Sequence, residues 1–387
     1  MKVDVLIIGA GISGAVLAER YAAIGKKVLI LEKRSHIAGN CYDYIDENGI
    51  LVSKYGAHLF HTNEEEVWKY VNKFSEWYDW EHKVIAKVDG KLVPIPVNIT
   101  TVNKLFNENI SSEEEMKDWL EKNRIDIQDP QNGKEAVLSK VGPELYEKMF
   151  RHYTKKQWDK YPEELDASVL DRIPVRTNYD DRYFSDKYQA LPKGGYTKLF
   201  EKILSHPNIH IELNTDYFDV KDKIEGYSKL FYTGPIDRFF EFKYSLEDKL
   251  EYRSINFVSE TVNKDFFQEN SVVNYPGMEV EYTRIIEYKH FGHQQAGKTT
   301  IVKEFTVDTG EPYYPVPNQK NREIYERYKK EADQLKDIYF VGRLANYKYF
   351  NMDQAFKNAL DLFKNLEGKS KRTRIARNEK KTVHRVQ

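Results

Sequence analysis

The chain lacks the features that mark several classes of protein. It has one cysteine in 387 residues, Cys41, which rules out an internal disulfide and fits a cytoplasmic location. The formal net charge is −1, so the chain as a whole is not built to bind nucleic acid. The longest apolar run near the N-terminus, residues 5–8, is far too short to cross a bilayer, and no signal-peptide pattern precedes it. We therefore expect neither membrane insertion nor secretion.

Sequence motifs of hydrolytic and metal chemistry are also missing. There is no GxSxG, no HExxH, no Walker lysine, and no CxxC or clustered spacing of metal ligands, so no metal site is predicted. His58 and His61 are three residues apart, but no Cys, Asp or Glu completes a nearby ligand set. A position beside a ring system is the better interpretation of this pair. The difficult chemistry is then expected from a bound cofactor that the protein positions.

The first 40 residues contain the strongest positive signal. An apolar strand at 3–8 leads into a turn with glycines at 9, 11 and 14, followed by a helix at 15–24 and a second strand at 27–31. Gly9 permits the tight turn, Gly11 lets a pyrophosphate approach the backbone, and Gly14 allows the helix to pack on the strand. The helix N-terminus then faces the phosphates. Glu32 ends the second strand, where a carboxylate can accept both ribose hydroxyls. This pattern predicts a dinucleotide site.

The rest of the chain predicts an α/β protein built from several domains. Residues 1–80, 192–238 and 318–368 are expected to form one discontinuous, Rossmann-like FAD-binding domain. Residues 81–191 read as a mainly helical domain for substrate binding, interrupted by a hairpin at 84–97 that turns at Asp89-Gly90. Residues 239–317 show the alternation of an antiparallel sheet. The basic segment 369–387 is predicted to be a disordered tail.

Individual elements are predicted within these domains. A capping box at 112–115 predicts a helix start, and Pro143 suits the first turn of another helix. The predicted helices are 65–77, 102–106, 112–123, 132–141 and 142–153, and the predicted sheet strands are 252–258, 271–275, 283–288 and 300–306.

Three clusters mix aromatic and cationic side chains. The first spans residues 150–158, where aromatics and cations together suit a stacked base and a nearby phosphate, although a core-facing aromatic stripe also fits. The other two contain Arg176 and Arg284, which could flank a diphosphate. Neither arginine has an adjacent acid on its own strand face, so their replacement is expected to leave the fold intact. The 28 tyrosines fit an aromatic-lined cleft, or only the overall composition.

The combination of motifs resembles the bacterial UDP-galactopyranose mutases over nearly all of residues 1–366. Ala38-Gly39 departs from a more usual Gly-Gly, and the tail after residue 367 lies outside the resemblance. The motifs are Tyr55-Gly56-Ala57-His58-Leu59-Phe60-His61-Thr62, Tyr153-Thr154-Lys155-Lys156-Gln157-Trp158, Arg172-Ile173-Pro174-Val175-Arg176, Gly194-Gly195-Tyr196, Tyr232-Thr233-Gly234-Pro235-Ile236-Asp237, Leu250-Glu251-Tyr252-Arg253-Ser254, Tyr282-Thr283-Arg284-Ile285-Ile286-Glu287, Glu311-Pro312-Tyr313-Tyr314-Pro315-Val316 and Gly342-Arg343-Leu344.

The resemblance implies a set of site residues. The residues implied to bind FAD are Gly9, Gly11, Ser13, Gly14, Glu32, Lys33, Asn40, His58, Leu59, His61, Arg343, Tyr349, Met352 and Asp353. The residues implied to bind substrate are Phe150, Tyr153, Thr154, Trp158, Arg176, Tyr183, Asn274, Arg284, Tyr313, Tyr314 and Tyr349. Arg176 and Arg284 are also the implied catalytic residues, Trp158 is expected at the edge of a mobile loop, and Tyr314 is preferred over Tyr313.

The resemblance also implies a reaction. UDP-galactopyranose and UDP-galactofuranose would be interconverted through an adduct between the sugar and N5 of reduced FAD, supplying galactofuranose for cell-surface glycans. The two arginines would stabilise the charge on departing UDP. A donor such as NAD(P)H would reduce the flavin, and a homodimer is expected. The alternatives are an FAD-dependent amine or sugar oxidase on the same fold, and a flavin-containing scaffold that works through its basic tail.

Overall fold

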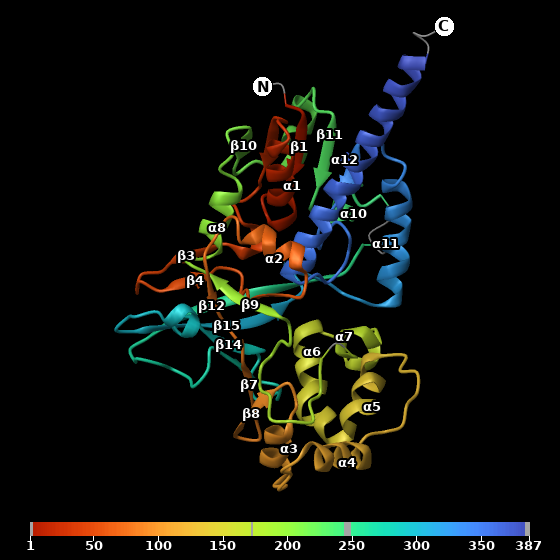
Figure 1. The fold of residues 1–387 in the computed structure, drawn as a ribbon. Helices are drawn as coiled ribbons and strands as arrows, with labels where there is room; N and C mark the ends of the chain where they lie inside the picture. Colours follow the sequence, from red (N-terminus) through yellow and green to blue (C-terminus); the bar gives the residue numbers. More distant parts are fainter. Residues whose placement is uncertain (1–2, 172, 244–248, 384–387) are drawn as a thin grey trace.

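A computed structural model describes residues 3–171, 173–243 and 249–383. Figure 1 shows a parallel sheet with its helices at one end, a group of helices at the other end, and a larger sheet between them. Both described ends of the chain lie at the end with the parallel sheet. The chain therefore forms a parallel sheet with its helices, a larger sheet and a group of helices, and it returns to the parallel sheet twice.

The parallel sheet has five strands in the order β10-β2-β1-β11-β17. The apolar runs of its three central strands β2, β1 and β11 are buried on both faces, and every neighbouring pair runs parallel. The predicted Rossmann-like fold class is confirmed, and the strands of this sheet come from separate stretches of the chain. These are β1 (Val5–Ile8), β2 (Val28–Leu31), β10 (Ile209–Glu212), β11 (Lys229–Tyr232) and β17 (Ile338–Phe340).

Helices cover both faces of this sheet. On one face α1 (Ile12–Ala23), α8 (Tyr196–Ile203) and α12 (Met352–Val383) share one apolar core with the strands. The opposite face packs on aromatic side chains from short helices, including α9 (Tyr217–Val220) and α10 (Ile236–Phe239). The β1–α1 turn is thus fixed between a buried strand and a buried helix.

The central sheet has seven strands and is mixed. Four predicted antiparallel strands are present, but the β7–β8 hairpin from the helical segment joins them, and β13 pairs with β7 in parallel. Residues 239–317 therefore do not form a sheet of their own. The strands, in spatial order, are β16 (Tyr314–Pro315), β12 (Tyr252–Val262), β15 (Thr299–Val307), β14 (Arg284–Glu287), β13 (Val272–Asn274), β7 (Val84–Val88) and β8 (Lys91–Ile95).

The helical segment follows the hairpin. The capping box at Ser112 and Glu115 is confirmed, and Gly142, at φ 79°, separates two helical stretches just before Pro143. A π-helical turn, η2 (Tyr146–Arg151), leads into α6 (His152–Trp158). The remaining helices here are α3 (Ile99–Phe106), α4 (Glu113–Asn123), α5 (Gly133–Leu145), the 3-10 turn η3 (Pro162–Glu164) and α7 (Ala167–Asp171).

Two local predictions are wrong. The helix predicted at 65–77 ends early as α2 (Glu65–Val71), and β6 (Trp77–Asp79) pairs with β9 (Tyr188–Pro192), because Trp77 packs on Phe60 and Trp68. The segment 369–383, predicted to be disordered, continues α12 as helix; its lysines, arginines and alanine favour helix, and no proline interrupts it. Residues 384–387 lie outside the described residues.

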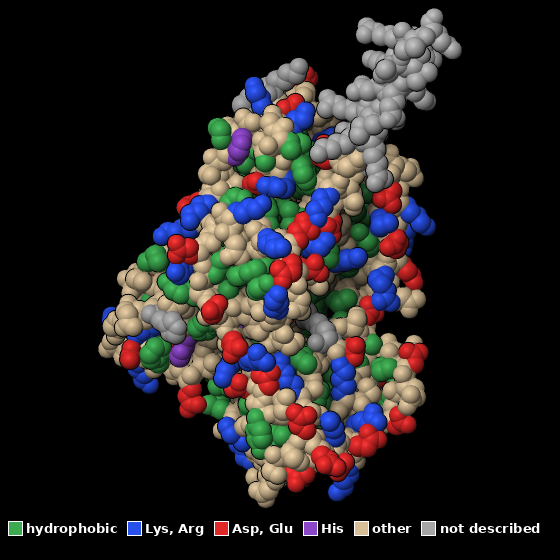
Figure 2. Space-filling model, viewed as in Figure 1, with side chains coloured by type: hydrophobic (Ala, Val, Ile, Leu, Met, Phe, Trp, Pro, Cys, Tyr) green, Lys and Arg blue, Asp and Glu red, His purple; other side chains and the backbone are tan. Residues whose placement is uncertain are grey.

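The remaining elements complete the described chain. They are η1 (Gly39–Cys41), β3 (Asp43–Ile45), β4 (Leu51–Ser53), β5 (Phe60–Thr62), η4 (Lys221–Lys223), η6 (Tyr288–His293) and α11 (Gln319–Ala332). Within the described residues, no helix is long and apolar enough to cross a membrane. Over the face shown in Figure 2, lysine and arginine side chains alternate with aspartate and glutamate, and many of them are paired, as Lys357 is with Asp361.

Candidate active site

The turn between β1 and α1 requires glycine at two positions. Gly9 has φ 102°, and a Cβ on it would lie 2.3 Å from Oγ1 of Thr233. A Cβ on Gly14 would lie 2.0 Å from the carbonyl oxygen of Gly9. A side chain on Gly9 would meet the residue that follows β11, and one on Gly14 would push α1 away from the end of β1, so the two glycines keep this turn tight. Such a helix N-terminus is suited to bind phosphate groups.

Glu32 lies where β2 ends and is 6% exposed. Its carboxylate accepts hydrogen bonds from the backbone N–H groups of Ala10 at 2.8 Å and Arg34 at 2.9 Å. A carboxylate has about four lone-pair sites, so two backbone bonds leave acceptor capacity for ligand hydroxyls. The backbone thus holds Glu32 rigidly at the edge of the cavity that begins at the glycine turn.

That cavity, here called the nucleotide cavity, collects most of the predicted cofactor residues. Those among its lining are Gly9, Gly11, Ser13, Glu32, Lys33, Asn40, His58, Arg343 and Met352. Those outside its lining are Gly14, Leu59, His61, Tyr349 and Asp353. A glycine turn, a fixed carboxylate and a helix N-terminus together fit a dinucleotide, and the lining continues from them to Arg343 and His58.

Ala38 takes a conformation that usually belongs to glycine. Its φ is 71°, and its N–H donates to the carbonyl of Ala10 at 3.0 Å. A left-handed non-glycine residue costs roughly 1 kcal/mol. Ala38 thus takes the left-handed conformation here, and Gly39 approaches Gly11 closely.

The two histidines of the first motif have different environments. The Nδ1 atom of His58 lies 2.8 Å from the carbonyl oxygen of Gly56, which it can approach only as a donor. Burial lowers the pKa of His58 to about 4, and the charges of Arg343 and Arg284 lower it further. His58 is thus neutral at pH 7 with a free acceptor at Nε2. His61 instead bonds Asp186 at 2.9 Å and stacks on Phe184.

An ion pair crosses the mouth of the nucleotide cavity. The Nζ atom of Lys33 donates to both carboxylate oxygens of Glu311, at 2.8 and 2.6 Å. Arg34 lies 3.6 Å from the same carboxylate and stands over the ring of Tyr55. Lys33 therefore links the loop after β2 to the segment before β16 and is engaged by protein.

Three polar side chains form a row across the central sheet. Asn274, Arg284 and Glu304 are direct partners on β13, β14 and β15, so they share one face. The side chains of Ile286 and Val302 on the same face belong to an apolar cluster. Asn274 Oδ1 and Glu304 Oε1 are buried and have no hydrogen-bond partner. Buried polar atoms of this kind indicate a missing partner, such as a ligand.

Arg284 is held by its neighbour on β15. Its Nε atom donates to Glu304 at 2.5 Å, and the side chains are 28% and 3% exposed, respectively. Burial disfavours the charged guanidinium, but Glu304 and Tyr153 outweigh it and raise the pKa of Arg284. The hydrogen bond to Glu304 uses Nε, so it does not occupy the two terminal nitrogens. The sequence shows no acid beside Arg284 on its own strand, and the acid that pairs with it lies on the adjacent strand β15.

Tyr153 is where several predicted substrate residues meet. Burial raises the pKa of its hydroxyl, which interacts electrostatically with Arg284, Tyr183, Glu304 and Tyr349. These partners come from the central sheet, from the segment after the helical region and from the loop before α12. The structure thus brings them together around the start of α6. The π-helical turn before α6 is a feature often found at functional sites.

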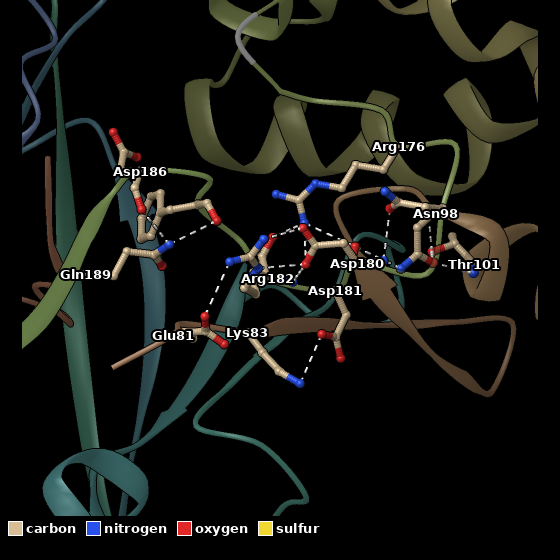
Figure 3. Close-up of polar contacts among 12 residues, drawn as sticks. Glu81, Lys83, Asn98, Thr101, Arg176, Asp180, Asp181, Arg182, Asp186 and Gln189 are labelled. Carbon is tan, nitrogen blue, oxygen red and sulfur yellow. Dashed lines mark hydrogen bonds and ion pairs between the residues drawn. The ribbon is translucent and has the colours of Figure 1, made fainter. Parts of the chain in front are cut away.

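Arg176 is anchored by its own loop, as Figure 3 shows. Its Nη1 atom donates to the carbonyl of Asp180 at 3.1 Å and to that of Arg182, and it lies 3.4 Å from the Asp180 carboxylate. Its Nη2 atom is buried and has no partner. One terminal nitrogen therefore shapes the loop that leads to Tyr183, and the other is available to an anion.

An aromatic group closes the cleft near Arg343. Tyr314 stacks on Tyr349 with ring centroids 5.1 Å apart, and Arg343 stands over both rings. Trp158 lies 5.9 Å from Tyr349 and is 3% exposed. Trp158 is therefore the buried last residue of α6, directly before the loop that starts at Asp159, and the mobility expected of that loop stays a prediction.

The remaining predicted residues divide between two environments. Tyr313 lines the nucleotide cavity, whereas Tyr314 belongs to the aromatic group. Phe150 is part of the core of the helical segment and is 9% exposed, and Thr154 is 2% exposed. The first predicted cluster offers no free cation beside them: Lys155 pairs with Asp159, and Lys156 donates to backbone carbonyls.

Comparisons with known proteins match this arrangement. A family model described as UDP-galactopyranose mutase matches residues 148–349, and a model of an NAD(P)-binding Rossmann-like domain matches residues 7–74. A probable UDP-galactopyranose mutase of Klebsiella pneumoniae is 40% identical over 362 residues, 92% of this chain and 93% of that protein. The chain belongs to the UDP-galactopyranose mutase family.

Two further relatives are similar over nearly their whole length. A dTDP-fucopyranose mutase of Escherichia coli is 40% identical over 366 residues, 92% of this chain and 96% of that protein. A UDP-galactopyranose mutase of Mycoplasma genitalium is 33% identical over 388 residues, 91% and 92% of the two chains. Family membership and the nucleotide fold together imply a flavin cofactor.

Solved structures share the fold at low identity. A reduced UDP-galactopyranose mutase superposes with a TM-score of 0.75 at 19% identity, covering 95% of this chain and 96% of that one. A putrescine oxidase variant superposes with a TM-score of 0.59 at 12% identity, covering 95% and 99%. The fold is therefore shared with an oxidase, and the sequence relationship identifies the mutase family.

Sequence reasoning missed several residues of this mutase-family site. Glu304 holds Arg284, Glu311 holds Lys33, and His82 is a buried histidine beside Arg284 whose pKa burial lowers to about 3. A signal existed for Glu304 only, as an acid in an otherwise apolar and threonine-rich strand. The other two depend on contacts between segments far apart in the sequence.

Proposed function

We propose that the chain interconverts UDP-galactopyranose and UDP-galactofuranose, with FAD bound in the nucleotide cavity and active in its reduced form. The observation that carries this proposal is the polar row of Asn274, Arg284 and Glu304 facing Tyr153. Two of its buried oxygens have no partner. A sugar offers hydroxyl donors to such oxygens, and a diphosphate offers the anion that the arginine requires.

The two arginines would act on the diphosphate. Arg284 is oriented through Nε, so its terminal nitrogens can form a bidentate contact. Arg176 has one buried terminal nitrogen without a partner. Negative charge grows on the diphosphate as its bond to the sugar breaks. Preorganised donors at that position stabilise the transition state, typically by about 3 kcal/mol for each donor.

Residues around the cofactor would add no charge beside the flavin ring and would exclude water from the sugar. Reduced FAD supplies the nucleophile for the anomeric carbon when it is bound. His58 is uncharged at pH 7 and has a free Nε2 acceptor, so it can accept a hydrogen bond from a ring N–H without adding charge. Trp158, Tyr314 and Tyr349 pack together at the cleft and would exclude water while the sugar is detached from UDP.

A chromatographic assay tests the proposal. The purified protein should release free FAD on denaturation. After reduction by dithionite, it should convert UDP-galactofuranose to UDP-galactopyranose, whereas the oxidised protein should not. Stoichiometric oxygen consumption with an amine or sugar, and no isomerisation after reduction, would favour the oxidase alternative. A protein without flavin would overturn both.

dTDP-fucopyranose is a second candidate substrate, because the Escherichia coli relative named for it is as similar as the Klebsiella pneumoniae relative. This substrate replaces uracil by thymine, lacks the ribose 2′-hydroxyl and carries a methyl group where galactose has a hydroxymethyl group. If a buried oxygen of the site accepts a hydrogen bond from a hydroxyl that one of the two substrates lacks, that substrate leaves the oxygen without a donor and is disfavoured. The ratio of kcat/KM for the two nucleotide sugars decides between them.

Three further expectations accompany the proposal. NAD(P)H or a similar donor would reduce the flavin, which anaerobic bleaching of the flavin absorbance measures. The chain would form a homodimer, which sedimentation measures. The galactofuranose product would enter cell-surface glycans.

A further inference from the structure

Lys156 on α6 is enclosed by backbone carbonyls. Its Nζ atom donates to the carbonyls of Gly277 at 2.7 Å, Tyr282 at 3.1 Å and Val280 at 3.2 Å, and also to that of Tyr275. An ammonium has three protons, so four acceptors share them. The usual partners of a lysine are carboxylates or water, and a set of converging carbonyls is a much more specific arrangement.

The carbonyls all belong to the loop between β13 and β14. This loop starts directly after Asn274 and ends directly before Arg284. Its base is closed by a hydrogen bond from the N–H of Tyr275 to the carbonyl of Thr283 at 2.9 Å. The rings of Tyr275 and Tyr282 meet edge to face, 4.9 Å apart. A cation bound inside the loop therefore fixes the ends of both strands, where the two polar residues lie.

The same lysine belongs to the opposite wall of the cleft. Tyr153 precedes it by three residues on α6 and interacts electrostatically with Arg284. Lys156 thus connects the element that carries Tyr153 to the loop that joins Asn274 on β13 to Arg284 on β14. The neighbouring Lys155 has no such role in the described contacts, since its Nζ atom bonds Asp159 one turn along the same helix.

We propose that Lys156 is a positioning residue for the mutase reaction, setting the distance across the cleft between Tyr153 on α6 and Asn274 and Arg284 on the sheet. The inference rests on the proposed function for its substrate. Lys156 does not contact the diphosphate itself, because its protons are used by the loop carbonyls. Its effect is on the affinity for the nucleotide sugar, exerted through Asn274 and Arg284.

The enclosure of Lys156 by the carbonyls of the β13–β14 loop, here called the clamp, also depends on pH. Burial lowers the pKa of Lys156 to about 8, and Glu279 in the enclosed loop opposes this shift. Glu279 is the charged group that the loop directs at Lys156; on α6 itself, Lys155 and Asp159 pair with one another. Above pH 8 the neutral amine has two protons and a lone pair that faces carbonyl oxygens. The clamp then weakens, and KM for the nucleotide sugar rises.

The experiment compares Lys156→Met with Lys155→Met, its neighbour on the same helix. For Lys156→Met we expect KM for UDP-galactose to rise about tenfold at pH 7, the effect of losing one charge-assisted contact, with a smaller change in kcat. The rise of KM above pH 8 expected for the wild type should be absent in this variant. Lys155→Met should keep both the wild-type KM and its pH profile.

Hydrogen exchange gives a readout that is independent of turnover. Amides 275–283 should exchange faster in Lys156→Met than in Lys155→Met, with flavin content unchanged. If Lys156→Met does not fold, Lys156→Arg keeps its charge at all pH values, and its KM should stay level between pH 7 and pH 9.5.

The inference is overturned if Lys156→Met, or Lys156→Arg where Met does not fold, retains the wild-type alkaline rise in KM. Unchanged exchange at 275–283 in Lys156→Met overturns it equally. A wild-type protein that does not isomerise either nucleotide sugar defeats the proposed function instead. In that case the affinity for UDP, measured over the same pH range, replaces KM in the comparison.

Discussion

The ion pair between Arg284 and Glu304 makes one prediction that separates catalysis from folding. Arg284→Met removes the cation but fills much of its volume, leaving the Glu304 carboxylate in a setting where its side chain is 3% exposed. Glu304→Gln keeps the shape and an acceptor for Nε while removing the charge. The double variant contains neither charge. Together the four proteins form a double-mutant cycle.

The structure sets the size of each effect. Removing one partner of a buried pair typically costs about 3–5 kcal/mol, and the 28% exposure of Arg284 places this pair at the lower end, about 3 kcal/mol. Removing both charges leaves no stranded carboxylate, so the double variant should lie within about 1 kcal/mol of the wild type. Turnover should fall about 10²-fold or more wherever Arg284 is missing, because a preorganised donor is lost.

Urea unfolding of the flavin-loaded proteins and turnover after dithionite reduction measure the two quantities. Stability should be lost in Arg284→Met and largely recovered in the double variant, while turnover stays low in both. A double variant as unstable as Arg284→Met would refute the stranded-charge argument. Recovery of turnover together with stability would show that Arg284 acts through the fold alone. Arg284→Lys should restore only part of the turnover, since an ammonium cannot form the bidentate contact.

Other predictions follow from single contacts. Burial lowers the pKa of His82 from 6.5 to about 3, so below pH 6.5 the unfolded chain binds a proton that the folded protein does not. Its share of the unfolding free energy should fall by about 2 kcal/mol from pH 7 to pH 5, and His82→Gln should flatten that slope in urea titrations. Gly14→Ala places a Cβ 2.0 Å from the Gly9 carbonyl, so purified protein should contain little FAD by absorbance, and normal content would contradict the role of this glycine. UDP should change tryptophan fluorescence less in Trp158→Phe than in the wild type; an equal change would show that another tryptophan is the reporter.

Local physics made much of the first domain predictable from sequence. The strand, glycine turn, helix and acidic residue of 3–32 follow from short-range rules, and the structure reproduces each of them. The same holds for the capping box at Ser112 and Glu115. The resemblance named Arg284, Tyr183 and Tyr349, which interact electrostatically with Tyr153, whereas Glu304 among these partners was missed, and the roles of all of them stay predictions.

The misses depend on strand register and on contacts between distant segments. Glu304 is twenty residues from Arg284, and only the register of β14 on β15 places them opposite each other. Trp77 reads as the end of a helix until β9 is seen to pair with it. The carbonyls around Lys156 leave no signal in the sequence, because every residue has the same backbone carbonyl whatever its side chain.

The β7–β8 hairpin limits where proteins of this family can be cut and joined into chimeras. Its pairing with β13 means that residues 81–191 do not form a module joined only by two linkers. Excising the segment would leave β13 as a bare edge, with Val272 and Val273 beside unpaired N–H and C=O groups, and exchanging it would pair β13 with a hairpin that did not evolve with it. Exposed edges of this kind invite pairing with other chains. Chimeras of these enzymes should therefore be cut after β8, so that the hairpin stays with the sheet that it completes.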